Sequence, residues 1–338
     1  MSAVLHAEVI RQAEPFAALE AEWWELWRHV AAATPFQSPA WLIPWWRCFH
    51  PGELFVVTVR AAGRLVGLAP FYVEDGTRRL LPLGISVSDH LDVLVAPGCE
   101  APAAQALVTG AERGGDAWDE WSLEELAPDA LAWGLPTPAG CEDVSAAQSA
   151  CPVLDLPVGA ENIWRFVPAR RRRDTNLARN RAARRGEVRI EPMDADAPGF
   201  LDILFRLHGA RWQSRGEAGV LAHDQVQDFQ RDALPRLAAA GLTRCFVLRI
   251  DGAAAAAHYG LTHRARAYAY LTGFDPDFAF ESPGVISLAQ ALEQAFGEGA
   301  RTFHFLRGPE AYKHAWGASD RWNRRRPFRR PVGRDSRA

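Results

Sequence analysis

Lysine is nearly absent from this sequence, and the one lysine lies in a segment rich in potentially reactive groups. Lysine and arginine together number 38 of the 338 residues, and Lys313 is the only lysine. Arginine cannot replace lysine where a compact ammonium with a shiftable pKa is needed. Chance alone would also leave one lysine somewhere. We therefore treat Lys313 as a candidate catalytic group for an oxyanion or a substrate anion, together with the neighbouring Tyr312.

Carboxylates close to chain turns could act as general bases that take a proton from a reacting group. Asp275 follows the apolar run 268–271, whose aromatic composition is typical of a buried strand, and is our third catalytic candidate. Glu310 is a candidate for substrate binding, as are Asp89 and Asp92 in the corresponding region of the first half of the chain. Each could equally be an ordinary turn or capping residue.

A predicted helix start between these groups suits an anion. Ser282 is placed to cap the helix, Pro283 suits its first turn, and Gly297 would end it. The first backbone N–H groups of a helix lack partners, and the macrodipole is positive there. We predict phosphate binding at Ser282, Gly284 and Val285, although a plain structural cap would look the same.

The strand predicted at 303–306 runs into Arg307 and Gly308, which we add to the cofactor-binding candidates. Two runs in this region, FDPDFAFESPG from residue 274 and FHFLRGPEAYKHAW from residue 303, carry a family resemblance. They resemble the C-terminal signature of the BioF2-like, CelD/BcsL-type acyltransferases of the GNAT superfamily, relatives of the Fem peptidyltransferases. The similarity extends more loosely from PFQSPAW at 35–41 to LHGARW at 207–212. The family commonly has an acidic residue where this chain has His304.

The resemblance implies an α/β (α+β) protein of two tandem GNAT-like domains, each with a mixed, mostly antiparallel sheet flanked by helices. It implies an N-acyltransferase that uses acetyl-CoA or another acyl-CoA. The acceptor would be an amine on a small molecule, a saccharide or an envelope-related compound. The Fem relationship leaves a donor of the aminoacyl-tRNA class open. A non-catalytic binding protein on the same fold is the third alternative, because fold alone does not fix function.

An internal repeat agrees with a tandem arrangement. Predicted strands flank a turn at Gly63 in the first half and at Gly252 in the second, 189 residues later. Further along, Gly98 precedes a helix, as Gly284 does 186 residues later. This nearly constant spacing indicates duplicated units.

We place the domain boundary near residue 157, which gives an N-terminal domain 1–156 and a C-terminal domain 157–338. The second domain would begin with an Arg-rich linking helix at 159–186. The first part of the Arg-rich tail 321–337 is predicted to close a sheet.

The Arg-rich helix has two interpretations. Eight arginines lie in residues 170–185, which could bind the phosphates of coenzyme A or RNA, or could form a solvated face. No aromatic residue lies within this run to stack on bases, which disfavours RNA. On the predicted helix 200–212, Arg211 and Trp212 share a face with His208 and are substrate-binding candidates, or simply a stable helix surface.

Composition excludes several classes of protein. A net charge of −3 gives no general reason to expect DNA binding. The five cysteines are widely spaced without a CxxC pair, which predicts reduced thiols in a cytoplasm. No apolar run approaches the length of a membrane span. The ten histidines show no HExxH spacing, so we expect no metal, and no GxSxG, P-loop or GxGxxG motif is present.

Overall fold

The structure is a computed structural model that describes residues 4–157, 159, 161–193, 197–214 and 216–331. The chain divides into two compact units, Met1–Ser149 with Trp322–Ala338, and Ala150–Arg321. Residues 150–156 thus lie in the second unit and residues 322–331 in the first, contrary to the boundary predicted near 157. The reason is strand pairing, because Val153 to Asp155 pair within the second unit and residues 324–329 pair within the first.

The first unit carries a mixed sheet with the strand order β1-β2-β3-β4-β6-β14, in which β4 and β6 are parallel. Its elements are β1 (Leu5–Ile10), α1 (Ala13–Ala18), α2 (Glu20–His29), η1 (Pro35–Gln37), α3 (Pro39–Phe49), β2 (Gly52–Ala61), β3 (Arg64–Glu74), β4 (Arg79–Pro82), β5 (Leu94–Val95), α4 (Glu100–Arg113), η2 (Gly115–Ala117), β6 (Glu120–Leu126), η3 (Leu131–Gly134), β7 (Glu142–Asp143), the start of β8 (Ala146–Asp155) and most of β14 (Ser319–Arg329). Most of β14, which belongs to the Arg-rich tail, pairs with β6 of the first unit.

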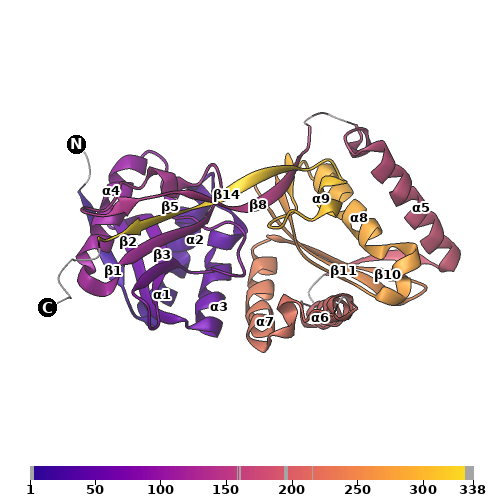
Figure 1. Ribbon diagram of the computed structural model, residues 1–338, viewed down its shortest axis with the longest axis horizontal. Coiled ribbons are helices and arrows are strands. Elements are labelled where there is room, and N and C mark those ends of the chain that lie inside the picture. The colour runs from indigo at the N-terminus through magenta and orange to yellow at the C-terminus, as the bar shows by residue number, and fades with distance from the viewer. Residues whose placement is uncertain (1–3, 158, 160, 194–196, 215, 332–338) are drawn as a thin grey trace. The chain divides into compact units, whose positions relative to one another are not determined.

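The second unit has the strand order β8-β13-β12-β11-β10-β9, in which only β12 and β13 are parallel. Its further elements are η4 (Ile163–Arg165), α5 (Ala169–Arg185), β9 (Val188–Pro192), α6 (Ala197–Gln213), η5 (Val220–Ala222), α7 (Asp224–Ala239), β10 (Thr243–Ile250), β11 (Ala253–His263), β12 (Arg266–Phe274), η6 (Pro276–Glu281), α8 (Pro283–Gly297), β13 (Thr302–His304) and α9 (Ala311–His314). Figure 1 shows α5 and α8 on one face of this sheet and α6 and α7 on the other.

The Arg-rich helix is shorter than predicted. It begins at Ala169 rather than 159, with Pro168 at its N-cap. A proline disfavours helical geometry at the residue before it, so Val167 cannot extend the helix backwards. Residue 160 of the predicted helix lies outside the described residues.

The predicted repeat is confirmed by the two hairpins. The turns Ala62-Gly63 and Asp251-Gly252 both have positive φ at both positions, which is typical of two-residue hairpins. Strands β2 and β3 show a register shift at Arg60, and β10 and β11 show one at Arg249, again 189 residues later. Each hairpin then leads through a third strand and a helix to a parallel strand.

Helix α8 is the crossover that makes β12 and β13 parallel. Its apolar positions recur at helical spacing and are buried against the sheet. Its residues Leu288, Leu292 and Ala295 pack in one cluster with Phe303 and Phe305, which flank the end of β13. The predicted helix end at Gly297 is confirmed.

Helix α6 approaches β12 closely on the opposite face. A Cβ atom at Gly273 would lie 2.5 Å from the backbone nitrogen of His208 and 2.8 Å from the carbonyl carbon of Leu207. Only glycine therefore fits at this crossing of helix and strand.

We expect Gly273→Ala to lower the free energy of unfolding by about 2 kcal/mol, because the helix backbone must move away from the strand. Urea unfolding measures this change. Gly209→Ala is the matched control on α6, since a Cβ there meets no atom within 4 Å. The control should be neutral or slightly stabilising, and an equal loss in both variants would contradict the close-approach argument.

Candidate functional site

Strands β12 and β13 part in the middle of the second unit. They pair at only three positions, from Arg266 with Thr302 to Tyr268 with His304. Beyond them, β12 continues to Phe274 and pairs with β11 alone among the described strands. Ala267 and Tyr268 are buried, whereas residues 269–272 are all partly exposed. A central strand is thus accessible over four residues.

The same stretch of β12 contains a bulge. Tyr259 of β11 pairs with Leu271 and Gly260 pairs with Ala269, so Tyr270 is the extra residue of the bulge. Such bulges redirect side chains and are frequent beside active sites. The Tyr270 hydroxyl accepts a hydrogen bond from Nε2 of Gln230 on α7, at 3.2 Å.

The segment after β12 leads into the N-terminus of α8. Ser282 does precede the helix as predicted, but it does not cap it with its side chain. It adopts a left-handed conformation (φ 54°) because it also ends η6, and its hydroxyl lies 3.5 Å from the Ala279 carbonyl. The Val285 N–H donates to the Ser282 carbonyl. Among the described residues, the Gly284 N–H has no acceptor, so it is the group in this turn that could donate to a phosphate.

Helix α5 places part of its positive charge beside this turn. Arg185 donates to the Asp277 carbonyl and to the Glu281 carboxylate, each at 3.0 Å. Arg181 donates to the Phe280 carbonyl. The Arg-rich helix therefore contacts η6, the segment that leads directly into α8.

Lys313 is buried, and its ammonium is fully occupied. Nζ lies 3.0 Å from the Leu306 carbonyl oxygen, 2.6 Å from that of Arg307 and 3.1 Å from that of Gly308. It also lies 2.9 Å from the Glu310 carboxylate. An ammonium has three protons, so no proton remains for a substrate. This geometry favours a positioning role for Lys313 over the catalytic role predicted from its rarity.

The loop held by Lys313 has an unusual backbone. Leu306 is buried with a φ of 61°, and Gly308 has a φ of 107°. A Cβ at Gly308 would lie 2.4 Å from a Glu310 carboxylate oxygen. The predicted pair Arg307 and Gly308 thus belongs to a tightly constrained turn after β13. Strained backbone of this kind is concentrated at functional sites.

The remaining candidates of the second unit have defined positions. Asp275 caps η6 by accepting a hydrogen bond from the Asp277 N–H at 3.0 Å. This is the capping role that was the alternative to a catalytic one. Tyr312 lies on α9 and is 42% exposed. His304 is buried, lies 3.1 Å from the Thr302 hydroxyl and packs against the Tyr268 ring. His304, at the position where the BioF2-like family commonly has an acidic residue, is thus the last residue of strand β13.

Arg211 and Trp212 lie on α6 with His208, as predicted. Arg211 donates to the carbonyl and hydroxyl of Thr272, within the exposed part of β12. Trp212 Nε1 donates to His208 Nε2 at 2.9 Å. Burial, with a further effect of Arg211, lowers the pKa of His208 to about 4, so its imidazole is neutral near pH 7. Arg211 thus reaches the exposed part of β12, while Trp212 is tied to His208.

Asp89 and Asp92 belong to the first unit and serve its structure. The Asp89 carbonyl accepts from the Asn323 amide. The Asp92 carboxylate accepts three backbone N–H groups, those of Val93, Leu131 and Ala132, at 2.7–2.8 Å. It therefore holds the start of η3, and this geometry favours a structural role over substrate binding.

The sequence reasoning missed Tyr270 and Gln230. Gln230 is fully buried on α7, and its Oε1 has no partner among the described residues. The hydroxyl of the buried Tyr259 also lacks one. Tyr268 and Tyr270 alternate in the sequence, which could have indicated Tyr270 as a candidate. The bulge at Tyr270, however, cannot be predicted from the sequence.

The sequence of the second unit matches a known domain family. Residues 169–314 match the family described as "Acetyltransferase (GNAT) domain". These residues are a GNAT acetyltransferase domain, and the chain is an acyltransferase. A comparison of the sequence with curated proteins finds no match. The BioF2-like, CelD/BcsL subtype stays a prediction.

Solved structures share the fold of this protein over nearly its whole length. A crystal structure of FemX is 11% identical, covers 95% of this chain and 96% of its own, and has a TM-score of 0.64. The C-terminal domain (DUF2156) of a putative lysylphosphatidylglycerol synthetase from Agrobacterium fabrum is 12% identical, with coverages of 96% and 93% and a TM-score of 0.56. L-PGS from Bacillus licheniformis is 13% identical, with coverages of 87% and 88% and a TM-score of 0.55. At these identities the likeness shows the fold alone.

Three further findings concern the described residues of this protein. No helix there is both long and apolar enough to cross a membrane. No cluster of three or more histidine, cysteine, aspartate or glutamate residues could hold a metal ion. The five cysteines are all free thiols.

We expect Lys313→Met to lower the free energy of unfolding by about 3 kcal/mol, because it leaves one buried and two partly buried carbonyls without this donor. Thermal and urea unfolding measure the change. Glu310→Gln is the control, since its carboxylate is 55% exposed and such an ion pair contributes little. Full stability of Lys313→Met together with a large loss of kcat would contradict the positioning role and support the catalytic one.

We expect the stability of the first unit to depend on the charge of Asp92. Burial raises the pKa of Asp92 to about 7 despite the three N–H donors. The folded state then binds more protons than the unfolded state between about pH 4 and 7, so stability falls as the pH rises through this range.

The test compares unfolding of the wild type and Asp92→Asn at pH 5 and pH 8 by tryptophan fluorescence, since most tryptophans lie in the first unit. The stability of the wild type relative to the variant should drop by about 2 to 3 kcal/mol at the higher pH. The exposed Asp75→Asn is the control and should show no such difference. A pH-independent difference for Asp92→Asn would contradict the raised pKa.

Proposed function

We propose that the protein is an acyl-CoA-dependent N-acyltransferase whose second unit carries the chemistry. The observation that carries this proposal is the parting of β12 and β13 after three paired residues. It leaves residues 269–272 of a central strand partly exposed. An extended strand can align a linear acyl chain beside its backbone groups, in the manner of an added strand.

The proposed reaction joins an amine to the thioester carbonyl carbon. The amine nitrogen attacks this carbon, a C–N bond forms, the C–S bond breaks, the amine loses a proton and the thiolate gains one. Such a reaction needs donors aimed at the developing oxyanion and an acid for the thiolate. Tyr270 and Tyr312 each carry a hydroxyl suited to the acid, and Asp275 is the candidate for the amine.

The N-terminus of α8 supports binding of the coenzyme A phosphates. The Gly284 N–H lacks an acceptor among the described residues, and the helix dipole favours negative charge there. Arg181 and Arg185 of α5 contact the preceding η6 and add positive charge nearby. Gly284, Arg181 and Arg185 thus form the phosphate-binding part of the proposal.

An aminoacyl-tRNA donor is the alternative, and the observation that favours it is the exposed part of α5. Arg170, Arg173 and Arg184 are exposed and form no ion pair among the described residues. Their charges could follow an RNA backbone. Small-molecule, saccharide or envelope-related amines remain the proposed acceptors under either donor.

We expect acetyl-CoA at about 100 times its Kd to stabilise the protein by roughly 2.7 kcal/mol, seen as a raised Tm. Gly284→Val should weaken acetyl-CoA binding at least about tenfold, because a branched side chain would crowd the free N–H. A Cβ at Gly284 comes no closer than 3.5 Å to the Phe274 ring, so the variant should fold.

Isothermal titration calorimetry measures the affinity, and Gly297→Val at the exposed far end of α8 is the control. An unchanged affinity in Gly284→Val would place the phosphates elsewhere. A wild type that shows no Tm shift with acetyl-CoA or longer acyl-CoAs, but binds tRNA with strong salt dependence, would favour the tRNA donor.

A further inference from the structure

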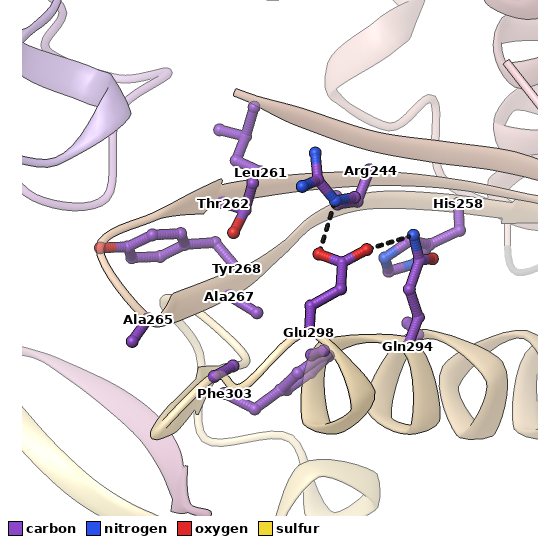
Figure 2. A pocket seen from close by; sticks show the side chains of 14 residues that line it. Arg244, His258, Leu261, Thr262, Ala265, Ala267, Tyr268, Gln294, Glu298 and Phe303 are labelled. Atoms are coloured by element: carbon purple, nitrogen blue, oxygen red, sulfur yellow. Dashed lines mark hydrogen bonds and ion pairs between the residues drawn. The ribbon is translucent and has the colours of Figure 1, made fainter. Parts of the chain in front are cut away.

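A cavity lies between the C-terminal half of α8 and the sheet of the second unit. Its volume is about 300 Å³, roughly twice that of an apolar cavity of ~150 Å³ that binds benzene. Ala291, Ala295 and Glu298 line it from α8 and the residue that follows the helix. Figure 2 shows the opposing strands, with His258 at one end and Tyr268 at the other.

This cavity is separate from the exposed part of β12. It is lined by Ala267 and Tyr268, where β13 is still paired, and not by residues 269–272. On α8 it reaches the last two turns, whereas the candidate phosphate site lies at the first turn. A molecule in this cavity would therefore not overlap the proposed acyl donor.

The cavity contains a buried imidazole whose hydrogen-bonding capacity is unused. His258 is 2% exposed and stacks on Phe246 with a centroid distance of 5.1 Å. Its Nδ1 is buried without a partner, and its Nε2 forms no hydrogen bond with any described residue. A buried polar group of this kind is costly unless a ligand or water satisfies it.

Gly260 keeps the imidazole edge accessible. A Cβ at this position would lie 2.9 Å from Nε2 of His258 and 2.7 Å from the carbonyl oxygen of Arg244. Any side chain at Gly260 would therefore cover Nε2. Glycine inside a strand often marks the close approach of a ligand or another chain.

The charged groups of the cavity neutralise one another. Nε of Arg244 donates to the Glu298 carboxylate at 2.7 Å, and the Gln294 amide donates to its other oxygen at 3.0 Å (Figure 2). Leu261, Phe303 and the alanines of α8 and β12 supply apolar surface. The two charges of the lining thus pair with each other, so the lining favours an uncharged ligand.

The protonation of His258 sets the polarity of the ligand. Burial lowers the pKa of His258 to about 4, so the ring is neutral near pH 7 and carries one N–H. An orphaned buried donor is rarer than an orphaned acceptor. The buried Nδ1 of His258 is therefore assigned as the unprotonated acceptor. The proton is then on Nε2, which is the donor on the cavity side.

We propose that this cavity binds a small uncharged molecule whose carbonyl or ether oxygen accepts a hydrogen bond from His258, while its apolar part lies against α8. The site goes beyond the proposed acyl transfer and does not depend on it. Its ligand class is that of aryl or short alkyl ketones, amides and lactones. Acetophenone is a suitable probe, because it combines one carbonyl with one ring.

The test is calorimetric titration of the full-length protein with acetophenone. Saturable binding is expected in the wild type and in Gly297→Ala, an exposed position at the end of α8. His258→Phe should weaken binding about tenfold, and Ala295→Leu should abolish it by filling the cavity. Ala291→Leu fills the same cavity one turn earlier and replaces Ala295→Leu if that variant does not fold.

Two results would overturn the proposal. One is the absence of saturable binding in the folded wild type, and the other is equal binding by the wild type and the filled variants. Nitrogen NMR of the histidine ring adds a readout independent of affinity, with the proton expected on Nε2. An Nδ1 proton would overturn the assigned polarity, and competition between acetophenone and acetyl-CoA would overturn the separateness of the site.

Discussion

The exposed stretch of β12 depends on how the chain after β13 is held. Beyond His304, the Phe305 N–H donates to the Pro152 carbonyl and the Gly308 N–H donates to the Ala150 carbonyl, both on the β8 side. The Lys313 ammonium then donates hydrogen bonds to three successive carbonyls of this turn. The chain is thereby kept on β8 and cannot continue the pairing with β12.

The two units share a topology but differ at this point. In the first unit, β4 and β6 also form a parallel pair after a hairpin and a crossover helix. There, however, β4 is buried over 80–82 and the neighbouring Trp121 packs edge-on against Phe71 and Phe328. Aromatic side chains thus pack around this parallel pair. This difference explains why an accessible strand is found in the second unit, where the GNAT domain family also matches.

Much of the fold was predictable because its signals are local. The hairpin turn at Asp251-Gly252 and the apolar period of α8 depend on residues adjacent in sequence. It was not predictable that residues 150–156 would join the sheet of the second unit and residues 322–329 that of the first. Either sheet could accept an apolar strand such as 151–156. For the site, the position of Gly284 at the helix start was correct. The hydrogen-bond partners of the Lys313 ammonium were not predictable. The carbonyls that surround it belong to a turn with a positive φ at Leu306.

The arginines of α5 make contacts that lysines could not make. Their guanidinium groups lie over aromatic rings, Arg185 at 3.8 Å from the Phe278 ring centroid and Arg181 at 4.4 Å from that of Phe280. A planar guanidinium can stack in this way while it donates in its own plane, which an ammonium cannot do. Stacking, together with the ion pair to Glu281, lets α5 pack despite its like charges. The turn after β13 has the opposite requirement, because three carbonyls converge on one point, and a compact ammonium satisfies them where a guanidinium plane would not fit.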